Sequence, residues 1–169
     1  MSLKGNEKLK RLNEALNALY MEQDDLYSAY AAHFGLSDTA FWILYAICEG
    51  SEVRTQNSLA ALFHIPPQSI NSAVAALIQQ GYVRLEQLPG ARSGKALHLT
   101  EAGQVFCARV ILPFFTIEEQ ALGALGEDAE RYVEFARRET AATRDGIEKA
   151  IQKANDTNKT AENIPKETL

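Results

Sequence analysis

The hydrophobic pattern of this chain changes its period at Gly81, and that change limits which folds the chain can adopt. Across residues 67–80, apolar side chains recur at the three- and four-residue spacing of a helix with one buried face. Residues 82–88 instead alternate apolar and polar side chains, as half-buried strands do. A turn-rich, net-basic loop at 89–95 and a second alternating segment at 97–99 follow. The pattern therefore predicts a helix followed by a hairpin with a long tip.

Further helices are expected directly before this pair. Residues 38–49 are apolar almost all round and are predicted to form a central helix, capped by Ser37 and ended by Gly50. Residues 55–63 are predicted to form a short helix, joined to the next one by a turn with the sequence His-Ile-Pro-Pro. We interpret His64 as a turn residue rather than a metal ligand, because His tolerates positive φ better than bulky residues do.

Long helices are predicted towards both ends of the chain, at residues 8–30, 100–115 and 127–153. The first carries a heptad-like apolar stripe on one face, made of Leu9, Leu12, Leu16, Leu19, Leu26 and Tyr30. Such a stripe needs a partner, either within the chain or from a second copy. Residues 154–169 are polar with little to bury, so we expect a disordered tail there.

The net charge of −5 on 169 residues disfavours a nucleic-acid partner, since domains that bind nucleic acids are usually basic. The charge is unevenly distributed, however. Residues 50–100 contain four basic and two acidic side chains, a net charge of +2, which leaves −7 for the remainder. No apolar run is long enough for a transmembrane helix, and the N-terminus lacks the apolar stretch of a signal peptide, so a cytoplasmic location is expected.

The two cysteines, Cys48 and Cys107, are far apart in the sequence and form no metal-binding or redox pair motif. Both lie among apolar residues, where a free cysteine behaves as a small hydrophobic residue. We therefore expect both to be free, buried and inert. A redox role would require a lowered thiolate pKa and access to solvent, which sequence does not reveal.

Helix, tight turn, helix and hairpin in this order form a winged helix-turn-helix, in which the second helix is suited to enter the major groove of DNA. Residues 55–70 resemble the helix-turn-helix of MarR-family regulators. Residues 77–83 (LIQQGYV) are similar to that family's entry to the wing, and residues 97–103 (LHLTEAG) to its exit. The apolar helix after Leu36-Ser37 also looks like the segment before the family's motif.

The resemblance implies a mainly α fold with a small β-hairpin. Residues 36–103 would form the DNA-binding lobe, and residues 1–35 and 104–153 a helical region that dimerises two chains. It also implies a sequence-specific, homodimeric transcriptional regulator, typically a repressor released by a small aromatic effector. A partner chain would cover the stripe on residues 8–30.

The resemblance assigns DNA contacts to polar and basic side chains of the two helices and the wing, namely Gln56, Gln68, Ser69, Asn71, Ser72, Arg92, Ser93 and Lys95. The chain departs from the family in its reading helix, which has no charged side chain between residues 66 and 80. Asn and Gln can pair with adenine, and Ser with a base or a phosphate. Two roles remain open for Arg84, which either pairs with Glu86 or contacts phosphate.

Effectors of this family bind between the dimerisation helices and the lobe, and the resemblance suggests Tyr30, His33, Trp42 and Tyr45 as lining residues. The alternative is that these are ordinary core and interface aromatics. The three histidines lie on separate elements without ligand spacing, so no metal and no cofactor are expected.

Two other functions compete with this interpretation. A winged-helix module that has lost DNA binding and contacts proteins would also explain the charge-free helix and the acidic total charge. An enzyme is disfavoured, because the sequence shows no Gly-rich phosphate loop, metal cluster or nucleophile elbow.

Overall fold

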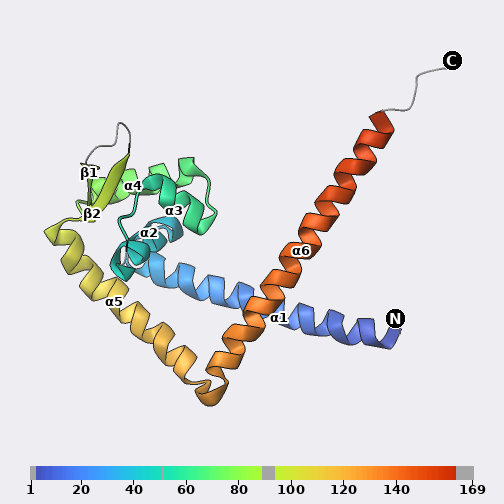
Figure 1. The fold of residues 1–169 in the computed structure, drawn as a ribbon. Coiled ribbons are helices and arrows are strands. Elements are labelled where there is room, and N and C mark those ends of the chain that lie inside the picture. Colours follow the sequence, from blue (N-terminus) through green and yellow to red (C-terminus); the bar gives the residue numbers. More distant parts are fainter. Residues whose placement is uncertain (1–2, 51, 89–93, 163–169) are drawn as a thin grey trace. The chain divides into compact units, whose positions relative to one another are not determined.

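The computed structural model describes residues 3–50, 52–88 and 94–162 and is mainly helical (Figure 1). The elements follow in the order α1 (Leu3–His33), α2 (Asp38–Glu49), α3 (Gln56–Phe63), α4 (Pro67–Gln79), β1 (Val83–Gln87), β2 (Lys95–Leu99), α5 (Glu101–Gly123), a 3₁₀ turn η1 (Gly126–Asp128) and α6 (Ala129–Glu162). The chain divides into two compact units, Met1–Thr116 and Ile117–Leu169. The expected fold class, helical with one hairpin, is confirmed.

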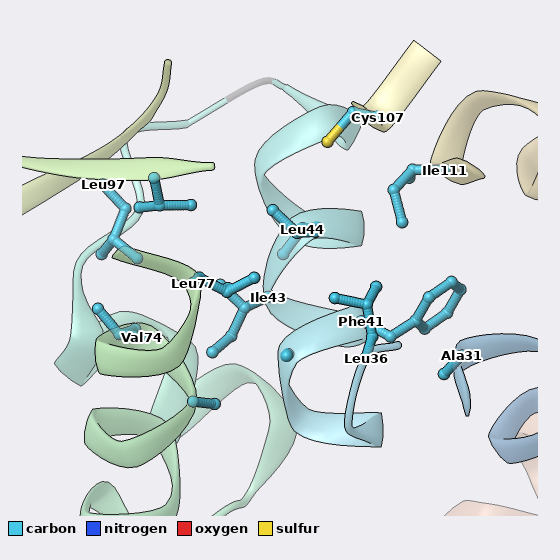
Figure 2. Packing of buried hydrophobic residues seen from close by; sticks show 14 of the residues in the cluster. Ala31, Leu36, Phe41, Ile43, Leu44, Val74, Leu77, Leu97, Cys107 and Ile111 are labelled. Atoms are coloured by element: carbon cyan, nitrogen blue, oxygen red, sulfur yellow. The ribbon is translucent and has the colours of Figure 1, made fainter. Parts of the chain in front are cut away.

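Helix α2 lies at the centre of the first unit, as its apolar sequence predicts. Ser37 caps it, with its Oγ accepting a hydrogen bond from the backbone N–H of Ala40 at 3.2 Å. Gly50 ends it in the left-handed conformation, at φ 79°. Figure 2 shows its side chains facing α4 on one side and α5 on the other. The buried residues on α2 are Ala40, Phe41, Ile43, Leu44 and Ala46.

The α3–α4 pair has the local geometry that its sequence predicts. Thr55 and Ser58 form a reciprocal capping box at the start of α3, with distances of 3.1 and 2.8 Å. His64 adopts the left-handed conformation at φ 53° and closes the helix through its N–H, which bonds to Ala60 O. Pro67 is the first residue of α4, where its missing N–H costs no hydrogen bond. The predicted turn role of His64 is therefore confirmed.

The wing is a two-stranded antiparallel hairpin in which Val83 pairs with Leu99 and Gln87 with Lys95. A bridge between Thr55 and Ala96 ties it to the segment before α3. Because that bridge fixes the start of α3 against β2, the helix-turn-helix and the wing form one body.

Helix α5 meets the wing at an unusually close contact between Gly103 and Tyr82. A Cβ atom added at Gly103 would lie 2.0 Å from the carbonyl oxygen of Tyr82. Thr100 completes the joint, because its N–H donates to Tyr82 O and its Oγ1 to Gly81 O, at 3.0 and 2.6 Å. The ring of Phe106 stacks on Tyr82 with centroids 4.3 Å apart. The glycine of the wing-exit motif is thus required by backbone packing.

The C-terminal turns of α1 pack into the lobe around an aromatic cluster. Phe114 of α5 lies at its centre, with ring centroids 5.1 Å from Tyr27 and 4.9 Å from both Tyr30 and Phe41. The earlier part of α1 behaves differently. Every residue from 7 to 26 is exposed apart from the half-buried Leu16. The predicted stripe therefore finds almost no cover within the described part of its own unit.

The second unit consists of the end of α5, η1 and α6. Helix α6 continues past Lys153 to Glu162, so residues 154–162 of the expected tail are drawn as helix. The rest of that expected tail, residues 163–169, lies outside the described residues. The local reason is that residues 154–162 contain no Gly or Pro, so nothing in their composition ends a helix that is already formed. None of the helices, within the residues described, is long and apolar enough to cross a membrane.

Candidate nucleic-acid interface

The N-terminal half of α4 presents an uncharged polar face to solvent. Ile70, Val74 and Leu77 anchor the opposite face in the core and are almost fully buried. Helical spacing then leaves four predicted contact residues exposed, namely Gln68, Ser69, Asn71 and Ser72. Their amide and hydroxyl groups are the kinds of donor and acceptor that read base edges.

The Asn71 amide is held by the neighbouring helix. Gln56, in the first turn of α3, donates from Nε2 to Asn71 Oδ1 at 2.8 Å. Ser72 donates from Oγ to the carbonyl oxygen of Gln68 at 3.0 Å, within α4 itself. The structure therefore brings together five of the eight predicted DNA-contacting residues, which span α3 and the start of α4.

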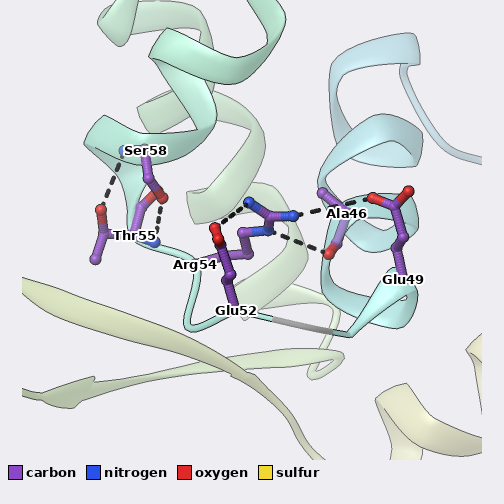
Figure 3. Close-up of polar contacts among 6 residues, drawn as sticks. All are labelled: Ala46, Glu49, Glu52, Arg54, Thr55 and Ser58. Carbon is purple, nitrogen blue, oxygen red and sulfur yellow. Dashed lines mark hydrogen bonds and ion pairs between the residues drawn. The ribbon is translucent and has the colours of Figure 1, made fainter.

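Arg54 is bound within the lobe instead of facing solvent (Figure 3). Its Nε donates to Ala46 O at 3.4 Å, and its terminal nitrogens lie 3.3 Å from Glu52 and 3.9 Å from Glu49. Only 12% of its side chain is exposed. It braces the end of α2 against the start of α3, so it adds little positive charge to a DNA-facing surface.

The wing carries the other basic residues. Arg84 pairs with Glu86 on β1, which favours the first of its two roles. The hydrogen bond and charge of Arg84, and to a lesser extent His98, lower the pKa of Glu86. Lys95, at the start of β2, is exposed. Arg92 and Ser93 lie outside the described residues.

The four residues suggested for an effector site have different surroundings in the described part of the chain. A cavity of about 290 Å³ between α1 and α2 takes in Trp42, together with Asp24, Tyr27, Ser28, Asp38, Thr39, Phe41 and Ile65. Tyr30 instead donates its hydroxyl to Val110 O at 2.8 Å, and burial raises its pKa. His33 packs edge-on against Phe34 and Tyr45 against Phe115, with centroids 4.9 and 4.6 Å apart.

The sequence did not predict that the two cysteines lie in contact. Both cysteines are free, as expected, but Cys48 is only partly buried. The thiols of Cys48 and Cys107 share a hydrogen bond, although 58 residues separate them in the chain. A pairing that depends on how α2 packs against α5 leaves no short-range signal in the sequence.

Comparison with known proteins agrees with this geometry. The model of the MarR family matches residues 34–92. No curated protein sequence matches the chain significantly. Among solved structures, a MarR family regulator from Neisseria meningitidis matches with a TM-score of 0.65 at 20% identity, over 87% of this chain and 98% of that one.

Two archaeal structures match similarly. The transcriptional regulator BldR from Sulfolobus solfataricus has a TM-score of 0.63 at 21% identity, covering 83% of this chain and 99% of its own. A MarR transcriptional regulator from Methanosarcina mazei has a TM-score of 0.59 at 18% identity, covering 82% and 98%. At these identities the likeness supports the fold, while the family model supports the lobe. The MarR-family model thus matches the segment that holds α2, the α3–α4 pair and β1, and the solved structures share the fold of the chain.

Proposed function

We propose that this chain is a sequence-specific, DNA-binding regulator of transcription that places α4 in the major groove. The observation that carries the proposal is the exposed polar face of Gln68, Ser69, Asn71 and Ser72, held on a helix whose other face is buried. The hydrogen bond from Gln56 orients the Asn71 amide before DNA arrives. A pre-oriented amide loses less side-chain entropy on binding a base.

Binding relies on polar groove contacts more than on charge. Arg54 and Arg84 are engaged within the protein, which leaves Lys95 and Arg92 as the basic residues of the lobe for phosphate. Each phosphate contact steepens the salt dependence of binding, so few contacts give a shallow slope. We therefore expect specificity to persist to higher salt than in a strongly basic relative.

The regulator acts as a homodimer. Apolar side chains are exposed along α1, including Leu9, Leu12 and Leu19, and along α6, including Tyr132 and Phe135. Exposed apolar surface on this scale marks an interaction site in soluble proteins. A dimer also presents two copies of α4, which suits a palindromic operator with half-sites about one helical turn apart.

The proposed response is release of a repressor from DNA by a small aromatic effector. The cavity beside Trp42 supports it, because aromatic rings of Tyr27, Phe41 and Trp42 line its wall. The chain has a single tryptophan, so tryptophan fluorescence reports on the surroundings of Trp42. Titration with phenolic acids should quench that fluorescence and weaken DNA binding in parallel. Quenching without loss of DNA binding would contradict the effector role.

The DNA proposal is tested by selecting duplexes from a random library and measuring binding to the selected duplex by fluorescence anisotropy. We expect the protein to bind the selected duplex about a thousandfold more tightly than a scrambled duplex of equal composition. Asn71→Ala and Gln68→Ala should each weaken specific binding by about 5- to 150-fold, the loss of a bidentate base contact. Gln79→Ala is the matched control, since Gln79 is exposed at the far end of α4. Equal affinity for selected and scrambled DNA at low salt would overturn the proposal.

A further inference from the structure

The thiols of Cys48 and Cys107 are two nucleophilic side chains that the proposed function leaves unused. Cys48 lies in the last turn of α2, and Cys107 lies on α5, one turn after Gly103. Figure 2 shows the sulfur of Cys107 directed towards the C-terminal end of α2. Cys107 belongs to the buried core, and Cys48 packs against that core from its edge.

The environments of the two thiols differ in a way that assigns a role to each. Cys48 is partly exposed, whereas Cys107 is 3% exposed, so Cys48 is the more accessible of the two residues. The S–H of Cys107 donates its hydrogen bond to Cys48 Sγ. That bond lowers the pKa of Cys48 against an opposing effect of burial, and the same bond together with burial raises the pKa of Cys107. The thiolate is the nucleophilic form of a cysteine, so Cys48 is the residue that reacts first.

We propose that Cys48 and Cys107 form an intramolecular, peroxide-reactive pair that closes to a disulfide joining α2 to α5. In the first step, the Cys48 thiolate attacks one oxygen of a hydroperoxide. The O–O bond breaks, an alcohol leaves after taking up a proton, and Cys48 becomes a sulfenic acid. In the second step, Cys107 Sγ attacks the sulfenic sulfur, its proton passes to the departing hydroxide, and water leaves. Both cysteines are oxidised by one electron each, and the hydroperoxide accepts both electrons.

The disulfide would change the lobe, because a disulfide places its sulfurs about 2 Å apart, closer than any hydrogen bond. Either the last turn of α2 or the adjacent turn of α5 has to move. Phe106, the neighbour of Cys107, stacks on Tyr82 at the base of the wing. Oxidation therefore acts on the same joint that positions the wing.

The test treats the folded, reduced protein with one equivalent of cumene hydroperoxide in the absence of DNA. We expect the intact mass to fall by two hydrogen atoms, both free thiols to disappear, and a Cys48–Cys107 linked peptide to be recovered without reduction. Cys107→Ala should stop at the sulfenic acid, trapped on Cys48 by dimedone. Cys48→Ser should react at least about tenfold more slowly, because a buried, protonated thiol is a poor nucleophile.

A native circular dichroism spectrum establishes that each variant has folded. The wild-type protein unfolded in urea provides a second control for the reaction rates of the thiols, and it needs no variant. In urea the two thiols should react at equal rates, since the fold no longer distinguishes them. Three results would each overturn the proposal: retention of both thiols in the folded wild type, equal reaction rates for the folded Cys48→Ser and Cys107→Ala variants, or a disulfide between two chains.

An effect on DNA binding would be a separate result that rests on the proposed function. If the selected duplex binds the oxidised protein at least about tenfold more weakly, and a thiol reductant restores binding, the pair regulates the DNA-binding surface. The chemistry of the pair is measured without DNA, so failure of the proposed function leaves the mass and peptide results interpretable.

Discussion

The winged-helix lobe and helix α6 differ in how much of their apolar side chains is exposed. In the lobe, Ile43, Leu59 and Leu77 are completely buried. On α6, Phe135 and Ile147 are more than half exposed. A helix in a protein owes most of its stability to packing of an apolar face. The contrast indicates that the lobe carries its own core, whereas α6 depends on a surface supplied from elsewhere, which in our proposal is a second copy.

The largest effect is expected from removing an aromatic side chain from the lobe. Phe41 is 1% exposed and packs edge-on against Phe114, so Phe41→Ala leaves a cavity in the aromatic cluster. We expect it to lower the free energy of unfolding by about 3–5 kcal/mol, measured by urea denaturation. Ile147→Ala, at an exposed position on α6, is the control and should lower the free energy of unfolding far less. Similar losses for both variants would erase the distinction between the two regions.

The second test compares two glycines. Gly103→Ala sets a Cβ against the Tyr82 carbonyl and should destabilise the lobe by about 3 kcal/mol, at the upper end of the cost of overpacking. Gly146 on α6 has nothing within 4 Å of its added Cβ, so Gly146→Ala should stabilise the protein by about 0.4–1 kcal/mol. Thermal melts of both variants give the comparison. A destabilising Gly146→Ala would mean that a partner chain packs closely on that position.

The third test addresses the cover of α6 directly. Phe135→Ala should leave the lobe unchanged but weaken dimerisation by about 1.5–3 kcal/mol, the cost of losing a buried aromatic side chain. Sedimentation equilibrium distinguishes the dimer from the 18.7 kDa chain. Arg138→Ala, on the same helix, serves as a charged-residue control. A wild-type chain that remains monomeric at every accessible concentration would refute the proposal that a second copy covers the apolar face of α6.

The smallest effect is expected at the wing surface. Arg84→Ala removes the partner that lowers the pKa of Glu86, so the carboxyl should titrate at a higher pH, as NMR would show. A lowered folded pKa stabilises the protein above the ordinary carboxyl pKa, and this stabilisation is lost as the pH falls through the folded value. Because both side chains are more than half exposed, the change in stability should be barely measurable. An unmoved Glu86 pKa would show that the pair does not form in solution.

Features set by local sequence were predicted well. The cap at Ser37, the end of α2 at Gly50, the turn at His64 and the period change into the wing all depend on a few neighbouring residues. The exposed face of α4 also follows, because helical spacing determines which residues remain outside.

Features set by packing between distant elements were not predicted. The burial of Arg54 requires both acidic partners and the end of α2 in place. The contact between Cys48 and Cys107 requires α5 to return to α2 after the whole lobe has been built. The Gln56–Asn71 hydrogen bond likewise depends on the angle between two helices, although both residues were predicted separately as DNA contacts.

The joint between Gly103 and Tyr82 has a mechanical consequence. Two backbones in such close contact cannot slide past one another, and Thr100 bonds to Gly81 and Tyr82 hold the same point. A displacement of α5 would therefore pivot about this joint and tilt the base of β1. A small tilt at the base grows along the paired strands, so the Gln87–Lys95 pair is displaced farther than the Val83–Leu99 pair.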